Sequence, residues 1–462
     1  MDIVNENSGT KHKSGKRGLN RLDVFVLAFG AMIGWGWVVL SGEWIERAGT
    51  LGAMLAFAVG GVLVLFVGLV YAELASAMPT TEGVLRFSKT ALGARSAFIC
   101  TWAIVLGFLA VIAFEAVALP TVINYLFPGY AKGYLYTVAG FDVYATWLAV
   151  GIGCSLLVAL INYIGIKFAA TLQTVLTCII LLIGILLAGG TAVNGSAENM
   201  EPLFAHDGLG GLLAVAVTTP FFYVGFDVIP QAAGEMHIAS RKIGRILIIS
   251  VAFAVAWYVM IVACVGANLS HDAMRASELP TADAMRSAFG NHPIAGKLLV
   301  FGGISGILTS WNAFYIGASR LLYAMAKERM LPAWLGKKHE KFDTPVNAIL
   351  MIAVITSLAP LLGKNMLSWL SNAGSFATVI TYLIVSVSFL VLRKKRPEME
   401  RPYRIRNWKF VGAGAVLLCL LMLTLYMPGL PSALVWPYEW AILIAWTLFG
   451  FILYRAAKHR GK

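Results

Sequence analysis

The feature that most constrains this chain is a succession of twelve long apolar stretches, which together take up most of its 462 residues. A helix needs roughly 20 consecutive apolar residues to cross a bilayer core about 30 Å thick. The chain is 59% hydrophobic and only 13% charged, which is far more apolar than a soluble protein of this length. The stretches lie near residues 22–44, 51–76, 97–127, 144–163, 168–190, 209–235, 245–268, 296–325, 346–362, 366–392, 409–427 and 434–455.

These stretches are continuous, whereas the strands of a transmembrane barrel alternate in polarity over about ten residues. We therefore expect an all-α integral membrane protein with 12 transmembrane helices. The first stretch is too long and too rich in glycine for a cleaved signal peptide, so we expect it to remain as a helix.

The net charge of +13 is distributed unevenly between the two sides of the expected membrane. Thirty of the 36 Lys and Arg fall in the N-terminal tail, the even-numbered loops and the C-terminus, and six fall on the other side. This asymmetry places both termini in the cytoplasm and argues against nucleic-acid binding. The run RKKRPEMERPYRIR at 393–406 is interpreted as a topology anchor, with contact to anionic lipid as the alternative.

The same pattern divides the chain into four parts. We expect a basic cytoplasmic tail (1–20), a transporter core of spans one to ten (21–392), a basic cytoplasmic loop (393–408) and a final pair of spans with the cytoplasmic C-terminus (409–462).

The five cysteines show no paired spacing, and no zinc, nucleotide or hydrolase motif occurs. We therefore expect no metal, no cofactor and no enzymatic activity.

Glycines interrupt the first apolar stretch, where residues 28–37 read AFGAMIGWGW. Gly30, Gly34 and Gly36 permit a break, and unwound backbone at membrane depth is tolerated only where it is buried or lines a cavity. The alternative is that Gly30 and Gly34 form a GxxxG face for packing against another helix.

A second interruption occurs five spans later, in TTPFFYVGFDVIPQAAGEM, where Pro220, Gly225, Asp227 and Pro230 fall in one apolar stretch. Interrupted helices in corresponding positions of two halves indicate a transporter site built from inverted repeats. The spacing fits a repeat of spans 1–5 and 6–10 with two appended helices. The free amides of such breaks suit a carboxylate and the free carbonyls suit an ammonium or a cation, so an amino acid or amine is the expected substrate.

From about residue 19 to 406 the chain resembles the amino acid/polyamine/organocation (APC) superfamily of permeases, which has the LeuT-type inverted-repeat fold. The resemblance rests on ordered stretches that include FGAMIGWGW, YAELASAMPTTEG, FFYVGFDVIPQAAGEM, ASRLLYAMAKERMLPAW, TPVNAIL and LRKKRPEMERPYRIR. It implies a small-molecule substrate but does not identify it.

The resemblance also implies where the substrate binds. The residues from Ala31 to Gly36, including Ile33 and Gly34, correspond to the unwound loop that binds the substrate carboxylate. Tyr223, Gly225 and Asp227 correspond to the unwound part of span six, and Phe314 falls near a position that contributes an aromatic ring. Trp35 departs from the small Ser or Thr that many relatives carry, so either its side chain points away or the pocket is unusual.

Two carboxyl groups fall at membrane depth, Glu115 in span three and Asp227 in the break of span six. Ionisable groups there are costly and are functional hypotheses by default, so both are candidates for proton coupling or ammonium recognition. The alternatives are a neutral buried carboxyl for Glu115 and a residue that caps the broken helix for Asp227. The other acids near span ends, Glu43, Glu46, Glu73 and Glu235, are interpreted as structural.

Aromatic side chains would complete the site, and cation–π contacts with them would favour a neutral or cationic amino acid or an amine. The expected walls are Trp35, Phe222, Tyr223, Phe226 and Phe314. Packing between helices is the alternative role for these rings. Thr309 and Ser310 are weak candidates for a sodium site, because hydroxyls on a membrane helix usually bond to the preceding turn.

Together these features predict a secondary transporter that works by alternating access, with proton-coupled symport or exchange. We expect it to lie in a plasma membrane and favour a bacterial one. Sodium is the alternative coupling ion. A transporter-like sensor, or a subunit that needs a partner chain, is the alternative function. An ion channel is disfavoured because the sequence has no ring of charges and no repeated filter loop.

Overall fold

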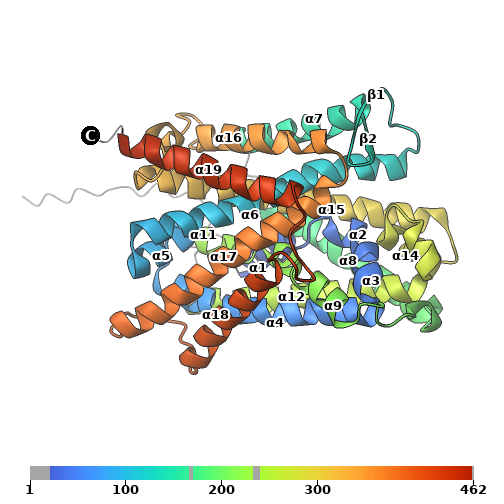
Figure 1. Cartoon of the computed structure of the whole chain (residues 1–462), viewed down its shortest axis with the longest axis horizontal. Coiled ribbons are helices and arrows are strands. Elements are labelled where there is room, and N and C mark those ends of the chain that lie inside the picture. The colour runs from blue at the N-terminus through green and yellow to red at the C-terminus, as the bar shows by residue number, and fades with distance from the viewer. Residues whose placement is uncertain (1–20, 166–169, 233–239, 460–462) are drawn as a thin grey trace, which may run out of the picture.

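The computed structural model describes residues 21–165, 170–232 and 240–459, and these residues form a bundle of helices that run along its long axis (Figure 1). The predicted basic tail and Glu235 lie outside the described residues.

The helices are α1 (Arg21–Met32), α2 (Gly36–Val39), α3 (Ser41–Ala48), α4 (Thr50–Ala77), α5 (Val84–Leu92), α6 (Ala94–Leu126), α7 (Ala145–Ile164), α8 (Ala170–Asn194), α9 (Leu209–Ala216), α10 (Thr219–Tyr223), α11 (Val228–Ala232), α12 (Ser240–Asn268), α13 (His271–Arg275), α14 (Pro280–Ala288), α15 (Pro293–Lys327), α16 (Val346–Ser357), α17 (Met366–Lys395), α18 (Trp408–Leu425) and α19 (Tyr438–His459). Short 3₁₀ helices cover Glu198–Met200, Ala333–Gly336 and Ala359–Leu362. The two strands are β1 (Tyr134–Val138) and β2 (Phe141–Tyr144).

The lengths and polarity of these helices are those of a multi-pass membrane protein. Among the described residues, ten helices are long and apolar enough to cross a membrane, and a bent pair makes up to eleven. The ninth predicted stretch forms only the shorter apolar segment Val346–Leu362. The all-α membrane fold is therefore confirmed, whereas helix length supports at most eleven of the twelve predicted spans.

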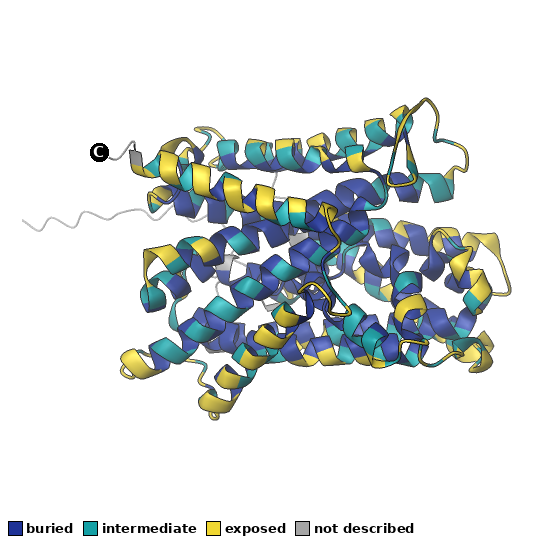
Figure 2. Ribbon diagram, in the orientation of Figure 1, coloured by how far each residue is buried: buried dark blue, intermediate teal, exposed yellow. Residues whose placement is uncertain are grey.

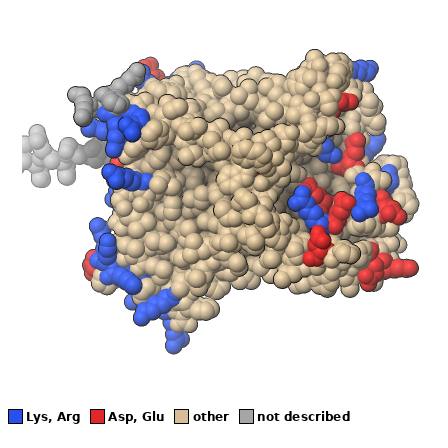
Figure 3. Space-filling view, in the orientation of Figure 1, with Lys and Arg blue, Asp and Glu red and all other residues tan. Residues whose placement is uncertain are grey.

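Charged side chains gather at the two ends of the molecule and leave a broad uncharged band between them (Figure 3). Lys and Arg dominate the end where α17 ends and α18 begins, which we call the basic end, and acidic side chains are more frequent at the opposite end. A band without charge between two charged ends is the surface that a bilayer requires.

The first span is interrupted, as its glycines predict. Helix α1 ends at Met32, α2 begins at Gly36, and α3 is bent by 68° relative to the preceding segment. The predicted unwound segment, Ala31 to Gly36, is longer than the observed break, because Ala31 is still helical and Gly36 is already helical. Residues 33–35, which we call the first break, are the part outside regular helix.

The sixth span is divided into three short helices. Helix α9 ends at Ala216, α10 covers Thr219–Tyr223, and α11 begins at Val228. The backbone turns at Gly225, which has a φ of +133°, a region that side-chain-bearing residues rarely adopt. Residues 224–227 therefore form the second break.

The two broken spans lie in the middle of the bundle. Helix α1 packs against α8, α11, α12 and α15, and α10 packs against α4 and α17. Buried ribbon runs through the middle of the molecule, whereas α19 is largely exposed and α18 carries both buried and exposed residues (Figure 2). Phe410 and Leu417 on α18 and Phe451 on α19 are more than half exposed, as expected for side chains that contact lipid.

A small β-hairpin between α6 and α7 was not predicted. Strands β1 and β2 pair antiparallel, and the Tyr136 hydroxyl donates to the carbonyl of Leu361 at 2.8 Å. The Asn365 amide donates to the carbonyl of Ala139. The hairpin thus packs on the connection between α16 and α17, outside the uncharged band.

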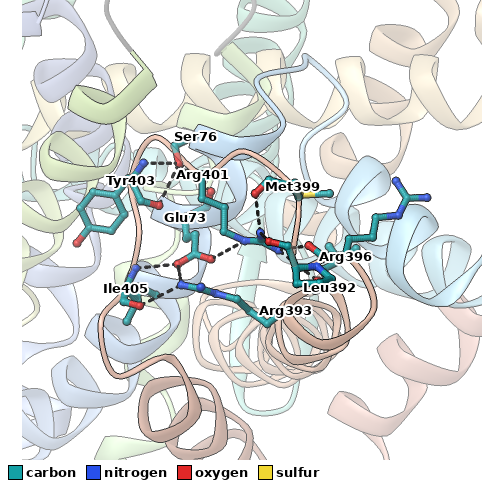
Figure 4. Close-up of polar contacts among 10 residues, drawn as sticks. Glu73, Ser76, Leu392, Arg393, Arg396, Met399, Arg401, Tyr403 and Ile405 are labelled. Atoms are coloured by element: carbon teal, nitrogen blue, oxygen red, sulfur yellow. Dashed lines mark hydrogen bonds and ion pairs between the residues drawn. The ribbon is translucent and has the colours of Figure 1, made fainter.

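Glu73 holds the loop between α17 and α18 against the end of α4 (Figure 4). Its Oε2 accepts from Arg393 Nη2 at 2.6 Å and from the Ile405 amide at 2.8 Å, and its Oε1 lies 3.1 Å from Arg401 Nε. The Glu73 side chain is 1% exposed, and those of both arginines are 6% exposed. Ser76 adds contacts to the backbone of Tyr403.

This network, which we call the Glu73 cluster, refines the interpretation of the basic run at 393–406. Arg393 and Arg401 are buried in ion pairs, so they are not part of a solvated charge anchor. The exposed cations of the run are Lys394, Lys395, Arg396, Arg404 and Arg406. Burial lowers the pKa of Arg401, although Glu73 acts in the opposite direction. Glu73 is structural, as predicted, and is buried in an ion-pair network.

Candidate functional site

The first break lies against α15, which carries glycines where the two backbones approach. A Cβ added at Gly306 would lie 2.7 Å from the carbonyl oxygen of Ile33 and 2.8 Å from that of Gly34. The indole ring of Trp35 lies against Gly303, one helical turn earlier, where a Cβ would overlap it. Trp35 therefore points towards α15, and its size is accommodated by the absence of a side chain at Gly303.

Glu115 on α6 reaches the first break from the other side. Its Oε1 accepts from the Trp35 amide at 3.3 Å and from the Ser310 hydroxyl at 2.6 Å. A Cβ at Gly34 would overlap this oxygen, so the carboxyl group lies directly against the Gly34 backbone. The side chain is 1% exposed, and its Oε2 has no hydrogen-bond partner in the described part of the chain. Glu115 thus joins α6, α15 and the first break.

Two hydroxyl groups hold carbonyls at the end of α1. Tyr258 on α12 donates to the carbonyl of Met32 at 3.0 Å. Thr309 on α15 lies 2.9 Å from the carbonyl oxygen of Gly30 and 3.0 Å from that of Gly306 in its own preceding turn. These contacts replace the intrahelical hydrogen bonds that α1 loses where it ends.

We expect Tyr258→Phe to lower the free energy of unfolding by about 1–3 kcal/mol, because the Met32 carbonyl loses its donor in a buried place. Chemical denaturation of the purified protein in detergent measures this change. Tyr454→Phe on α19 is the control, since Tyr454 is only half-buried and its ring packs on Phe98. Equal stability of the two variants would contradict a structural role for the Tyr258 hydroxyl.

The second break touches the end of α1 through Gly225. A Cβ there would lie 2.9 Å from the amide nitrogen of Met32 and 3.0 Å from the carbonyl carbon of Ala31. Asp227 is fully buried, and its Oδ1 accepts from the Gly225 amide at 2.9 Å. The bond satisfies a free amide of the break, as the capping interpretation expects, but the donor precedes Asp227 in the chain, so it is not an N-cap bond to α11. Asp227 Oδ2 has no partner among the described residues.

The expected aromatic walls divide into three groups. Phe222 lies against Gly36 and packs with Trp44 at a ring-centroid distance of 4.8 Å. Phe226 packs with Tyr71 and Tyr382 at ring-centroid distances of 5.4 and 5.6 Å. Phe314 packs with Phe108 on α6 at 5.2 Å, and Tyr223 donates to the carbonyl of Phe57 at 2.8 Å. Phe222 therefore lies beside the first break, whereas Phe226 belongs to the second break and packs against α4 and α17.

The weak sodium candidates already have partners. The Thr309 hydroxyl contacts two carbonyls, and the Ser310 hydroxyl contacts Glu115 and lies 3.2 Å from the Ile307 carbonyl oxygen. Both therefore make the bond to the preceding turn that the alternative interpretation predicts, and both also reach another element. Within the described ranges, no group of three or more His, Cys, Asp or Glu could hold a metal ion.

Comparison with known proteins agrees with this arrangement. Residues 19–452 match the amino acid permease family. The chain belongs to the amino acid permease family. It is 28% identical to a branched-chain amino acid permease of Bacillus subtilis (strain 168), over 98% of this chain and 95% of that one. It is 26% identical to an aspartate–proton symporter of the same organism, over 87% and 78%. It is also 27% identical to human cationic amino acid transporter 4, over 83% and 61%.

Membership of the family confirms the resemblance to the APC permeases. The permease is a multi-pass membrane transport protein and not an enzyme. The names of the three relatives cover neutral, acidic and basic amino acids, so similarity alone does not select the charge of the substrate.

The permease also has a hollow of about 330 Å³ at the end opposite the basic end. Its charged lining residues are Glu43, Glu46, Arg275, Glu278 and Lys364. Glu43 and Glu46, predicted to be structural, each pair with an arginine at this end. Beside α3, the Thr281 hydroxyl donates to the Trp37 carbonyl at 2.6 Å and contacts the Ser41 hydroxyl at 2.9 Å. These contacts join α14 to α2 and to the start of α3.

Sequence reasoning missed Tyr258, Gly303 and Gly306, which shape the first break from two neighbouring helices. The run FGGISG in the eighth span was the available signal, because glycines in a membrane helix mark places where another backbone approaches. Tyr258 carried no signal, since a tyrosine in an apolar helix looks the same whether or not it holds a distant carbonyl.

Proposed function

We propose that this permease is a secondary transporter for an amino acid or a related amine, which it binds between the two breaks and moves by alternating access. The observation that carries the proposal is the contact between the two interrupted spans, with Glu115 at the first break and Asp227 at the second. Costly buried carboxyls at unwound backbone are typical of a site that handles a charged molecule.

The chemistry of the site supports a zwitterion or an ammonium compound as the substrate. Backbone amides of the first break suit a carboxylate, and the unpartnered oxygens of Glu115 and Asp227 suit an ammonium group or a proton. Phe222 at the first break adds an aromatic face that favours a cation. A neutral or cationic amino acid, or an amine, therefore fits better than an acidic one.

The surrounding arrangement is part of the same proposal. We propose that the basic end faces the cytoplasm and that both termini lie on that side, and the proposal is supported by the retention of Lys and Arg on the cytoplasmic side of a plasma membrane. Residues 21–392 form the transporter core, and α18 and α19 are appended to it. Protons are the proposed coupling ion and sodium is the alternative.

Uptake by the purified protein in proteoliposomes tests the proposal. Labelled leucine, lysine, aspartate and simple amines are offered under an imposed proton or sodium gradient. We expect one substrate class to accumulate, and we expect Glu115→Gln and Asp227→Asn each to lower gradient-driven uptake about tenfold or more, because each loses an ionisable group at the site.

Glu439→Gln is the matched control, since Glu439 is a fully buried carboxyl group on α19 that contacts Asn372 and the Val435 amide, away from both breaks. Its uptake should equal that of the wild type. If folded protein moves no compound under either gradient or by exchange, the sensor or partner-dependent alternative replaces the transporter proposal.

A further inference from the structure

The carboxyl group of Glu115 lies where the proposed function places the carboxylate of the substrate. The Trp35 amide is one of the backbone donors of the first break, and it already donates to Glu115 Oε1 at 3.3 Å. The same oxygen lies against the Gly34 backbone, closer than a side chain at that position would allow. A substrate carboxylate therefore cannot reach this donor while Glu115 stays in place.

Glu115 and a substrate carboxylate would compete for the same backbone donor, the Trp35 amide. Glu115 is 1% exposed, so little water is present to satisfy that donor in its place. Its second oxygen, Oε2, has no partner among the described residues, so only one of the two oxygens holds the group at the break. A carboxyl group held through one oxygen can be released without breaking a wider network.

We propose that Glu115 is an internal ligand of the first break, which substitutes for the substrate carboxylate in the empty site and is displaced from the Trp35 amide when the substrate binds. This inference rests on the proposed function and adds which group accepts the hydrogen bond of the Trp35 amide when no substrate is bound. Ser310 is a positioning residue, because its hydroxyl holds Glu115 Oε1 at 2.6 Å and lies on α15, outside the break.

An internal ligand has a consequence that an ammonium-binding residue does not have. Removing it frees a backbone donor for a competing carboxylate, so compounds with a carboxylate but no α-amino group should bind more tightly. If Glu115 instead binds ammonium, removing it should weaken compounds with an amine, and Ser310→Ala, which keeps the carboxyl group, should leave carboxylate-only compounds unchanged.

Binding assays on the purified full-length chain separate these outcomes. The probes are leucine, lysine and aspartate, their deaminated analogues 4-methylpentanoate, 6-aminohexanoate and succinate, and their decarboxylated analogues 3-methylbutylamine, cadaverine and β-alanine. Ligand-dependent thermal stabilisation reports binding whether or not transport occurs. We expect Glu115→Ala to bind the deaminated analogue of the preferred amino acid about tenfold more tightly than the wild type, as a charge-assisted hydrogen bond to backbone predicts.

Ser310→Ala provides a second test, because it keeps the carboxyl group and removes one of the two donors to Oε1. This variant should also bind the deaminated analogue more tightly than the wild type, but by a smaller factor than Glu115→Ala. Glu439→Gln should bind the analogue as the wild type does. Unchanged or weaker binding of the deaminated analogue by both Glu115→Ala and Ser310→Ala overturns the inference. If the wild type binds none of the nine probes and transports nothing, the proposed function itself fails, and this is a distinguishable result.

Discussion

Glu73→Ala is expected to lower the free energy of unfolding by about 3–5 kcal/mol, because it leaves two buried guanidinium groups without their carboxylate. Arg393 and Arg401 have side chains that are only 6% exposed, so water cannot replace the lost partner without local opening. The amide of Ile405 loses its acceptor as well. The loop between α17 and α18 would then detach from the end of α4. Chemical denaturation of the purified variant in detergent measures the loss.

The matched control is Glu46→Gln, which removes an ion pair of similar length, 3.0 Å to Arg275, in which both side chains are at least half exposed. Exposed pairs of this kind contribute less than about 1 kcal/mol. A Glu73→Ala variant that unfolds like the Glu46→Gln variant would show that the buried network contributes no more than a surface pair.

Gly225→Ala is expected to abolish transport and to lower the free energy of unfolding by about 3–5 kcal/mol, combining backbone strain with a steric overlap. The φ of +133° strains any side-chain-bearing residue, and the new Cβ would lie 2.9 Å from the Met32 amide nitrogen. Neither Ala31 nor Met32 can yield by a change of rotamer, because the atoms in contact include their backbone. The two breaks would be forced apart. Uptake in proteoliposomes and denaturation in detergent measure the two effects.

Gly93→Ala separates strain from overlap. Gly93 joins α5 and α6 with a φ of +89°, and a Cβ there would meet nothing within 4 Å. We expect Gly93→Ala to lower the free energy of unfolding by about 1–3 kcal/mol and to leave the transport rate unchanged. If Gly225→Ala transports as well as Gly93→Ala does, close contact between the breaks is not required for function.

Much of the architecture could be predicted from local sequence. The apolar stretches placed the helices, because each backbone group in a bilayer core must be satisfied within its own segment. The breaks at Gly34 and Gly225 could be predicted because glycine and proline act locally on the backbone. The length of the first break was overestimated, since the helical state of Ala31 depends on the neighbouring helices and not on its own preference.

The partners of the buried carboxyls could not be predicted. Glu73 is separated from Arg393 by 320 residues, and Glu115 is separated from Ser310 by 195. No periodicity within a helix records which distant side chain will face it. The orientation of Trp35 was open for the same reason, because the space it occupies is created by a glycine on another helix.

The sequence by itself determined that the chain crosses the membrane many times, that spans one and six are interrupted, and that two acids lie within apolar spans. These properties follow from composition and backbone chemistry within single segments. Only the tertiary structure decided that Glu115 contacts the first break, that Asp227 bonds the second, and that Glu73 is buried with two arginines. These contacts join residues far apart in the chain, and their geometry is set by how the helices pack rather than by any one helix.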